Sequence, residues 1–594
     1  MTAAVKLLKI TAFSWLVLLL LLLINIKTSG LINFYFGNLL YYLFGFWPIG
    51  LILYYNRAKL ANKCKEINLF LSNRLEEESG LNNKKIIFLT LTIILIAGLA
   101  LRIFAAHKIG LSADSFLHME SAKSILAGEG NFYNRAALYT YFIAGSYFIF
   151  GATDAATHIP NLLLAGATIL FSYYAGRKMF GSGIAILSAT LMAFSFWHIG
   201  ETANVRMYIF FSLTSFIFFY TAWRFLFTPK IFKPDARPIE KVALLKLPYL
   251  GIIAFWLLIS LSLQALTVIL VPPFFIFFVL LAGYYIWTDF HQGVTSVRAD
   301  NALKIVLLMA VASGIALVFM PEILGQFWSN LKWNNEAAHN FKLLGESLRN
   351  GYGWLLGLYG QWLFFLSLSV FFIFAIIKKH IGYLFWLFMF VGVWLESVFL
   401  IDRYFSPRYI IFLLPIFAPI LSASIYWLVS IPIKKTLWRT GISLAIILVI
   451  TPWPKIGEII KNKTGENAIF GINYDFKGAI NSLLISQNDA LIQTFFGPFE
   501  FYQNTSKNIF NIGRLSHDGA GTEIPAEEAE KIFLKTVDKY SHGYFLTDFY
   551  RFEKWPCENY VPCGIYDHIE ANPDKWRQRS YRDDPQIIIY EWRN

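Results

Sequence analysis

The sequence predicts an all-α polytopic membrane protein with a small α/β domain at its C-terminal end. Its residues are 56% hydrophobic and only 15% charged, whereas about a quarter of the residues in a soluble domain are charged. A soluble core could not bury so much apolar surface, because cores stop growing and chains divide into domains as they lengthen. Long apolar runs at 15–26, 86–101 and 440–450 are instead typical of segments that cross a bilayer.

The N-terminal segment 1–55 is expected to form a transmembrane hairpin. Lys6 and Lys9 precede a leucine-rich run that is longer than the apolar region of a signal peptide, and no small-residue cleavage site follows it. A second apolar run at 32–55 supplies the other half of the hairpin. Residues 56–85 then form a charged cytoplasmic linker.

Residues 86–456 are expected to form the main membrane domain, a bundle of roughly eleven core spans. Basic residues gather in alternate connections, at 177–178, 230–246, 378–379 and 434–439, which places these connections in the cytoplasm. They also explain the formal net charge of +13 without a nucleic-acid partner. The expected spans are 86–106, 155–177, 183–199, 207–227, 248–264, 267–287, 303–320, 355–377, 382–400, 409–431 and 439–455.

Residues 457–594 are expected to form a small extracytoplasmic α/β domain. An amphipathic helix pattern at 526–540 is combined with short strand-like runs at 490–496 and 586–592. Counting the spans from a cytoplasmic N-terminus places this tail outside the plasma (inner) membrane. Cys557 and Cys563 agree with that side, because their C-x5-C spacing does not fit a zinc ribbon and favours a short disulfide in an oxidising compartment.

The first outer loop, 107–154, contains a candidate catalytic carboxylate and an aromatic segment, 138–150, that is expected to lie as a helix in the membrane interface. Asp114 follows the first core span directly and has apolar residues on both sides. A carboxylate at this depth is a candidate general base or metal ligand. The alternative is that Asp114 caps the helix that starts there.

Further charged residues lie where later spans meet the same face. Glu201 and Arg206 lie between two spans, and they are either functional or form an ion pair that anchors the turn. Arg403 and Arg408 frame the outer end of another span, and guanidinium groups suit phosphate. Each arginine could instead extend to lipid headgroups. The candidate phosphate-binding residues are Arg135, Arg206, Arg403 and Arg408.

A divalent metal ion is an open alternative at this face. His118 follows Asp114 by four residues, and His198 precedes Glu201 by three. On helices, each pair would present two metal-binding side chains on one face. No nucleotide-binding glycine motif occurs in the sequence, so no other cofactor is expected.

Three motifs in order resemble the GT-C superfamily of glycosyltransferases, in its protein O-mannosyltransferase and lipid A aminoarabinose transferase branch. They are Asp114 after the first core span, the Glu-x-x-x-x-Arg-Met-Tyr segment that begins at Glu201, and a span that opens with Arg408 and Tyr409 and continues through Pro415 and Pro419. The resemblance covers residues 86–456 and rests on the order and sidedness of the motifs.

The resemblance implies an inverting enzyme that takes a sugar from a polyprenyl-phosphate donor and transfers it to a glycan, lipid or protein acceptor at the membrane. Asp114 matches the catalytic carboxylate, Glu201 the second acidic position and Arg408 the phosphate-side arginine. Ser115 replaces a glutamate that often follows the aspartate, and His158-Ile159-Pro160 replaces an Arg-x-Pro motif. These departures bear on the acceptor more than on the chemistry.

Two other classes of protein fit parts of the pattern. An O-antigen-type polymerase or ligase also joins lipid-linked sugars, but it does not usually have a folded tail of this size. A lipid or sugar transporter would have interrupted helices near the midplane and repeats between its halves, and the sequence contains no repeat.

Overall fold

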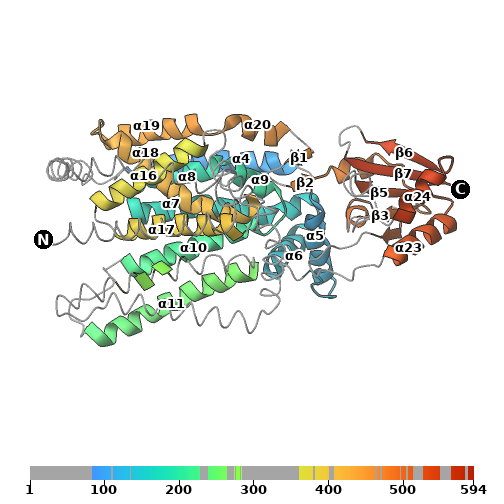
Figure 1. Cartoon of the computed structure of the whole chain (residues 1–594), viewed down its shortest axis with the longest axis horizontal. Coiled ribbons are helices and arrows are strands. Elements are labelled where there is room, and N and C mark those ends of the chain that lie inside the picture. The colour runs from blue at the N-terminus through green and yellow to red at the C-terminus, as the bar shows by residue number, and fades with distance from the viewer. Residues whose placement is uncertain are drawn as a thin grey trace, which may run out of the picture.

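The computed structural model describes a bundle of apolar helices with a five-stranded sheet at one end (Figure 1). The described residues are 83–108, 111–133, 136–227, 238–263, isolated positions in 273–283, 360–378, 381–400, 407–461, 465–467, 471–494, 497–503, 506–512, 526–548, 563–581 and 586–594. The hairpin expected at 1–55, nearly all of the linker and the span expected at 303–320 lie outside them.

Within the described residues, three segments are long and apolar enough to cross a membrane, or up to five if each bent pair of helices is one span. The three are Lys84–His107, Asp154–Phe180 and Ile410–Ser430. The chain is accordingly a multi-pass membrane protein. The long helices of the bundle are α4 (Lys84–Lys108), α7 (Asp154–Phe180), α10 (Tyr208–Phe227), α11 (Pro238–Leu263), α16 (Gly360–Ile377), α17 (Ile381–Leu400) and α18 (Leu414–Ser430), each at an expected span.

Two expected spans are not continuous helices. The span expected at 183–199 is α8 (Ser182–Phe194) followed by α9 (Phe196–Ala203), with a 50° bend between them. The side chain of Ser195 accepts a hydrogen bond from the backbone N–H of His198 and so caps α9. The span expected at 439–455 is α19 (Thr436–Ile450) and α20 (Trp453–Lys461), bent by 53°, where Pro452 has no N–H to continue the helix.

The loop expected to contain Asp114 forms two helices at the end of the bundle next to the sheet (Figure 1). They are α5 (Ala113–Leu126) and α6 (Ala137–Phe150), which pack against each other. The helix expected at 138–150 is therefore confirmed. Large apolar side chains of α6 remain exposed, as a helix in a membrane interface requires: Tyr141, Phe142, Phe148, Ile149 and Phe150.

The C-terminal part contains the expected mixture of strands and helices. Its sheet has the order β4-β3-β5-β7-β6, in which β4, β3 and β5 are parallel and β5, β7 and β6 are antiparallel neighbours. The strands are β3 (Ala490–Gln493), β4 (Asn508–Asn511), β5 (His542–Asp548), β6 (Trp576–Ser580) and β7 (Ile587–Arg593), and a separate hairpin pairs β1 (Gly465–Asn467) with β2 (Gly471–Asn473).

The two faces of this sheet pack against different parts of the molecule. One face, with Ile492 and Phe545, is buried with α23 (Ala526–Lys539) and α24 (Cys563–Ala571). The other face, with Leu491 and Leu546, belongs to the same apolar core as the helical bundle. The short helices α21 (Phe476–Asn481) and α22 (Pro498–Tyr502) contribute to the core that the sheet shares with the helical bundle. Cys557 and the side chain of Cys563 are outside the described residues, so their disulfide stays a prediction.

Candidate functional site

The first turn of α5 brings the segment of Asp114 to the end of the bundle that adjoins the sheet. Ser112 takes the N-cap position of α5, and Asp114 is the second residue of the helix, so the alternative in which Asp114 is the N-cap is wrong. A carboxylate in the first turn still suits the positive end of the helix dipole. The Ser112 hydroxyl lies 2.8 Å from that of Ser115, which is fully buried. The side chain of Asp114 itself is outside the described residues.

Glu201 lies next to this turn through an asparagine that joins the two segments. The Asn204 side-chain amide donates to Oε2 of Glu201 at 3.4 Å, and its Oδ1 accepts from the Ser112 hydroxyl at 3.4 Å. Both Glu201 and Asn204 are buried at the end of α9. The structure therefore brings together Glu201 and the backbone segment that bears Asp114, two candidates that are 87 positions apart (201 − 114).

A second asparagine fixes the end of α9 to α7. The amide of Asn161, fully buried in α7, donates to the backbone carbonyls of Asn204 at 2.7 Å and Thr202 at 3.3 Å. Neither asparagine was predicted as a site residue from the sequence. For Asn161 the available signal was an amide within an apolar span, where an unpaired polar group is expensive; Asn204 lies between two expected spans.

Arg206 follows Asn204 closely and is also buried. Its backbone N–H donates to the Asn204 carbonyl at 2.8 Å, and its guanidinium carbon lies 5.7 Å from the centre of the Tyr208 ring. A guanidinium that is removed from water is stabilised only when charge or hydrogen-bond partners surround it. Of the candidate arginines, Arg206 is also the nearest in the chain to the Glu201–Asn204 contact.

Arg102 is a buried charge that the sequence analysis missed. It lies in α4, and its guanidinium donates to the carbonyls of Met192 and Ala193, both at 2.8 Å, and of Gly98 at 2.7 Å. It also donates to Nδ1 of His198 at 2.9 Å. The last carbonyls of α8 have no partner in the next helix, because the helix is broken at Ser195, and Arg102 satisfies them. Arg102 thus holds the break from which α9 carries Glu201 into the site.

The residues proposed as metal ligands lie in different surroundings. Nδ1 of His118 lies 2.9 Å from the Thr140 hydroxyl, and its ring packs edge-on against Tyr133 and Tyr139. Nδ1 of His198 is bonded to a guanidinium, whose positive charge disfavours a cation beside it. Among the described residues, no three His, Cys, Asp or Glu side chains form a group that could hold a metal ion.

The remaining phosphate-binding candidates are only partly described. Arg408 lies in the 3-10 helix η4 (Pro407–Leu413), whose side chains are described only from Ile410 onward, and Arg135 and Arg403 lie outside the described residues. The 3-10 helix contacts α9 and α10. The short helix that bears Arg408 therefore packs against the two helices that flank Arg206.

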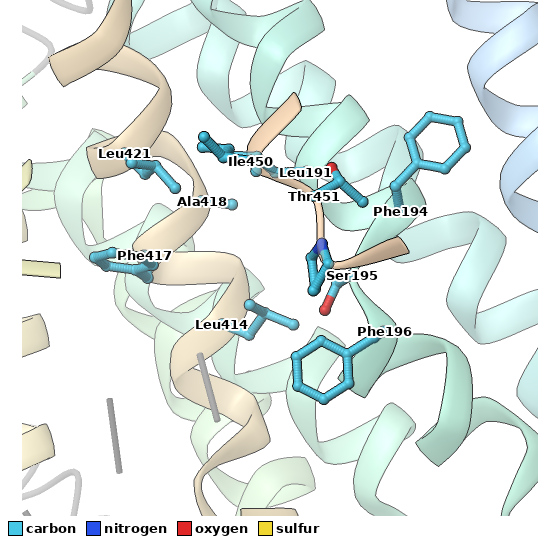
Figure 2. Close-up of a pocket in the computed structure, with 11 residues that line it drawn as sticks. Leu191, Phe194, Ser195, Phe196, Leu414, Phe417, Ala418, Leu421, Ile450 and Thr451 are labelled. Carbon is cyan, nitrogen blue, oxygen red and sulfur yellow. The ribbon is translucent and has the colours of Figure 1, made fainter. Parts of the chain in front are cut away.

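An apolar groove lies where the two bent spans meet α18 (Figure 2). It has a volume of ≈ 40 Å³ and includes the break residues Ser195, Thr451 and Pro452. The other lining side chains are apolar: Leu191, Phe194, Phe196, Leu414, Phe417, Ala418, Leu421 and Ile450. The groove is far smaller than a typical ligand pocket of about 300–1,000 Å³.

Apolar helices, an α5–α6 pair at one end and buried charges beside it make this chain a multi-pass membrane protein with buried polar contacts at one end of its bundle, and its fold is similar to that of solved membrane proteins. The crystal structure of ArnT from Cupriavidus metallidurans bound to undecaprenyl phosphate is similar to this chain, with a TM-score of 0.52 and 9% sequence identity over 86% of this chain and 98% of that chain. The apo form of ArnT is similar to the same degree, with a TM-score of 0.52, 10% identity and coverage of 85% and 98%.

An archaeal oligosaccharyltransferase, AglB from Archaeoglobus fulgidus in complex with an inhibitory peptide and a dolichol-phosphate, has a TM-score of 0.48 and 12% identity over 79% of this chain and 70% of that chain. No family model matches the sequence, and no curated protein matches it.

Proposed function

We propose that this chain is a membrane glycosyltransferase that moves a monosaccharide from a polyprenyl-phosphate carrier to an acceptor on the outer face of the plasma (inner) membrane. The observation that supports it most directly is the Ser112–Asn204–Glu201 contact, which joins the segment of Asp114 to a second buried carboxylate. The fold adds support, because ArnT, which shares it, was crystallised with undecaprenyl phosphate.

In the proposed reaction, Asp114 is the general base. It takes the proton of an acceptor hydroxyl as that oxygen attacks the anomeric carbon of the sugar. The oxygen attacks on the face opposite the phosphate, the bond between the anomeric carbon and the phosphate oxygen breaks, and polyprenyl phosphate leaves with the electron pair. Because the displacement is in line, the configuration at the carbon is inverted. Glu201 is the second acidic group, held beside the same turn by Asn204. General base catalysis of this kind contributes about 10²- to 10⁴-fold in rate.

The leaving phosphate needs positive charge that is already in place before the bond breaks. Arg408 is the main candidate, and Arg206 is the candidate that is buried between α9 and α10. Arg403 and Arg135 complete the proposed phosphate-binding set. A planar guanidinium can donate two parallel hydrogen bonds to phosphate, which an ammonium cannot do.

The two bent spans favour a second candidate, a lipid or sugar transporter, because interrupted helices near the midplane mark transporter sites. Here the longer halves, α8 and α19, hold 13 and 15 residues, and the shorter halves hold 8 and 9. Since a helix rises 1.5 Å per residue, the longer halves extend about 20 Å from the basic connections at which they begin. On the proposed topology, the breaks would then lie beyond the middle of a hydrocarbon core that is about 30 Å thick, away from the midplane position that a transporter site would have.

The Asp114→Asn variant tests the proposed function. The amide keeps the size of the side chain but cannot accept the proton, so transfer from a panel of labelled undecaprenyl-phosphate sugars should fall about 10²- to 10⁴-fold. Binding of undecaprenyl phosphate and thermal stability should be unchanged. The matched control is Glu129→Gln, the same carboxyl-to-amide change at an exposed position just after α5.

Arg408→Ala should differ from Asp114→Asn, because it removes a charge-assisted contact to phosphate and so weakens binding of undecaprenyl phosphate as well as turnover. Arg177→Ala, at an exposed position near the other end of α7, is its control. Near-normal transfer by Asp114→Asn would exclude Asp114 as the base and make Glu201 the next residue to test. Movement of lipid-linked sugar across vesicles without transfer would favour the transporter.

A further inference from the structure

The C-terminal part of the chain packs directly on α5, the helix that bears Asp114. Phe116, two residues after Asp114, is fully buried. Three rings of the C-terminal part meet its ring edge-on, Phe476 at 5.5 Å, Tyr502 at 5.8 Å and Phe501 at 6.3 Å between ring centres. Phe116 therefore has its apolar surroundings supplied by α21 and α22, and not only by its own helix pair.

The two backbones also come into contact on either side of Phe116. Leu111 forms an isolated antiparallel bridge with Tyr474, whose N–H donates to the Leu111 carbonyl at 3.5 Å. Gly497, just before α22, has φ +99°, and a Cβ built on it would lie 2.9 Å from Cβ of Phe116 and 3.1 Å from Cγ of Glu120. Only glycine fits at this position, both for its backbone conformation and for its approach to α5.

Polar contacts at the edge of this interface join it to the start of α7. Nζ of Lys477 lies 3.1 Å from Oδ2 of Asp154, and the Tyr502 hydroxyl lies 3.5 Å from Oδ1 of the same residue. On α5, Nζ of Lys123 lies 4.5 Å from the centre of the Phe501 ring. The C-terminal part thus contacts the beginning of α7 as well as the length of α5.

We propose that the C-terminal part positions Asp114, and that Phe116 and Gly497 are the positioning residues through which it acts. This inference rests on the proposed function, since it assumes that Asp114 is the base. The first turn of α5 is held on one side by the 3.4 Å bond from Ser112 to Asn204 and on the other by the C-terminal rings. Losing the second support would let the turn move, and a shift of about 1 Å at a catalytic group can cost about 10²-fold in rate.

The Gly497→Ala variant tests this positioning role without altering α5 itself. The added methyl group meets Phe116, so we expect α22 to separate from α5. Amide hydrogen exchange in the peptide 113–126 should become roughly tenfold faster or more, since local opening exposes those amides. The kcat of transfer should fall about 10²-fold, while the KM for the undecaprenyl-phosphate sugar stays near the wild-type value because the arginines are untouched.

Two controls separate positioning from general loss of structure. Gly457→Ala, at a helical glycine with open space around it, should change neither quantity. Slow exchange in strands β3, β5 and β7 of Gly497→Ala would show that the sheet remains folded. On the other side of the contact, Phe116→Ala should also accelerate the exchange and lower kcat. Phe116→Leu should retain most of the activity, because it keeps an apolar side chain among the three aromatic residues of the C-terminal part.

A reversible cross-link provides the rescue experiment. The Cα atoms of residues paired across an antiparallel bridge lie about 4.5–5.5 Å apart, within the range of about 4.4–6.8 Å that a disulfide spans. Leu111→Cys and Tyr474→Cys, added to Gly497→Ala, should restore slow exchange and transfer when oxidised and lose both when reduced. The wild type and each single cysteine variant, oxidised and reduced, control for Cys64, Cys557 and Cys563.

The outcomes distinguish this inference from the proposed function. Unchanged exchange of 113–126 in both Gly497→Ala and Phe116→Ala would overturn the positioning role, whatever the transfer rate. Faster exchange with a normal kcat would overturn it as well. If the wild type transfers no sugar while the two variants still show faster exchange, the proposed function is wrong and only the packing of the C-terminal part on α5 is supported.

Discussion

His542 lies between two carboxylates in the C-terminal part, so both of its ring nitrogens have acceptors. Nδ1 lies 2.8 Å from Oδ1 of Asp489, and Nε2 lies 3.0 Å from Oε1 of Glu591. Glu591 is buried and also contacts Arg579 and Arg593. Two acceptors require two N–H donors, so the imidazolium form fits this position and the neutral ring does not.

These contacts shift the pKa values in opposite directions. Burial alone would lower the pKa of His542, but the hydrogen bonds to Glu591 and Asp489 outweigh it and raise the pKa above the usual value of 6.5. Burial alone would raise the pKa of Glu591, but hydrogen bonds from His542, Arg593 and Arg579 lower it to about 2. The pKa of Asp489 is lowered as well, because hydrogen bonds from Ser486 and His542 outweigh burial.

We therefore expect the sheet to lose stability at both ends of the pH range. The contribution of His542 is complete below pH 6.5 and is lost as the pH rises through its raised folded pKa. That of Glu591 is complete above its unfolded pKa of 4.5 and is lost as the pH falls toward 2. Hydrogen exchange of strands β5 and β7 should accelerate from pH 6 to pH 9 beyond the intrinsic rate, and His542→Gln should remove this acceleration. The same pH dependence in the variant would contradict the assignment.

At the scale of the elements, the broken span α8–α9 depends on a close approach to α4. Gly98 of α4 faces the end of α8, where an added Cβ would lie 2.9 Å from Cβ and 3.2 Å from Cα of Ala193. The same approach lets Arg102, one turn further along α4, reach the carbonyls of Met192 and Ala193. The packing of two helices and the polar contacts at the break are therefore coupled.

The Gly98→Ala variant should separate α4 from α8 and weaken the hydrogen bonds of Arg102. Overfilling a packed interface typically costs about 1–3 kcal/mol, and thermal unfolding in detergent would report the loss. Gly145→Ala is the matched control, because nothing lies within 4 Å of its added Cβ in helix α6. Alanine at that helical position should be neutral or should stabilise by about 0.5–1 kcal/mol. Equal stability of the two variants would mean that the α4–α8 contact is not tight.

The sequence predicts the helices and misses the contacts between them, for a physical reason that these elements illustrate. Apolar runs place α4, α7 and α10 to within a few residues. The break at Pro452 has a local cause and could have been predicted, but the break at Ser195 depends on Arg102, which lies 93 positions away (195 − 102). An arginine in an apolar run is a visible signal, whereas its partners are not, since they are backbone carbonyls of another helix.

The candidate site divides in the same way. Asp114 and Glu201 stood out because charges at the ends of apolar spans are rare, and the structure brings Glu201 to the turn that bears Asp114. Asn161 and Asn204 did not stand out, although they make the contacts that join these segments. Their role depends on three helices meeting, and no local pattern of residues encodes that meeting.

At the scale of the whole molecule, the C-terminal part packs on α5, so the two must lie on the same side of the membrane. Tyr474 and Leu111 are bonded neighbours, so the tail and the first loop lie at the same end of the bundle (Figure 1). A short disulfide at Cys557–Cys563 is expected only if this end faces an oxidising compartment. If the tail is outside the membrane, the disulfide and the proposed base at the outer face are both possible; if it is in the cytoplasm, neither is expected.

We expect the C-terminus to be extracytoplasmic, because the basic connections at 177–178 and 434–439 lie at the other end of their helices. Alkaline phosphatase fused after Asn594 should be active, and a green fluorescent reporter at the same point should be dark, since each folds on only one side. Fusions truncated after Lys178 should show the reverse pair of signals. A silent phosphatase with a fluorescent reporter after Asn594 would place the tail, α5 and Asp114 in the cytoplasm. The proposed transfer at the outer face would then be excluded, while the packing of the tail on α5 would be unaffected.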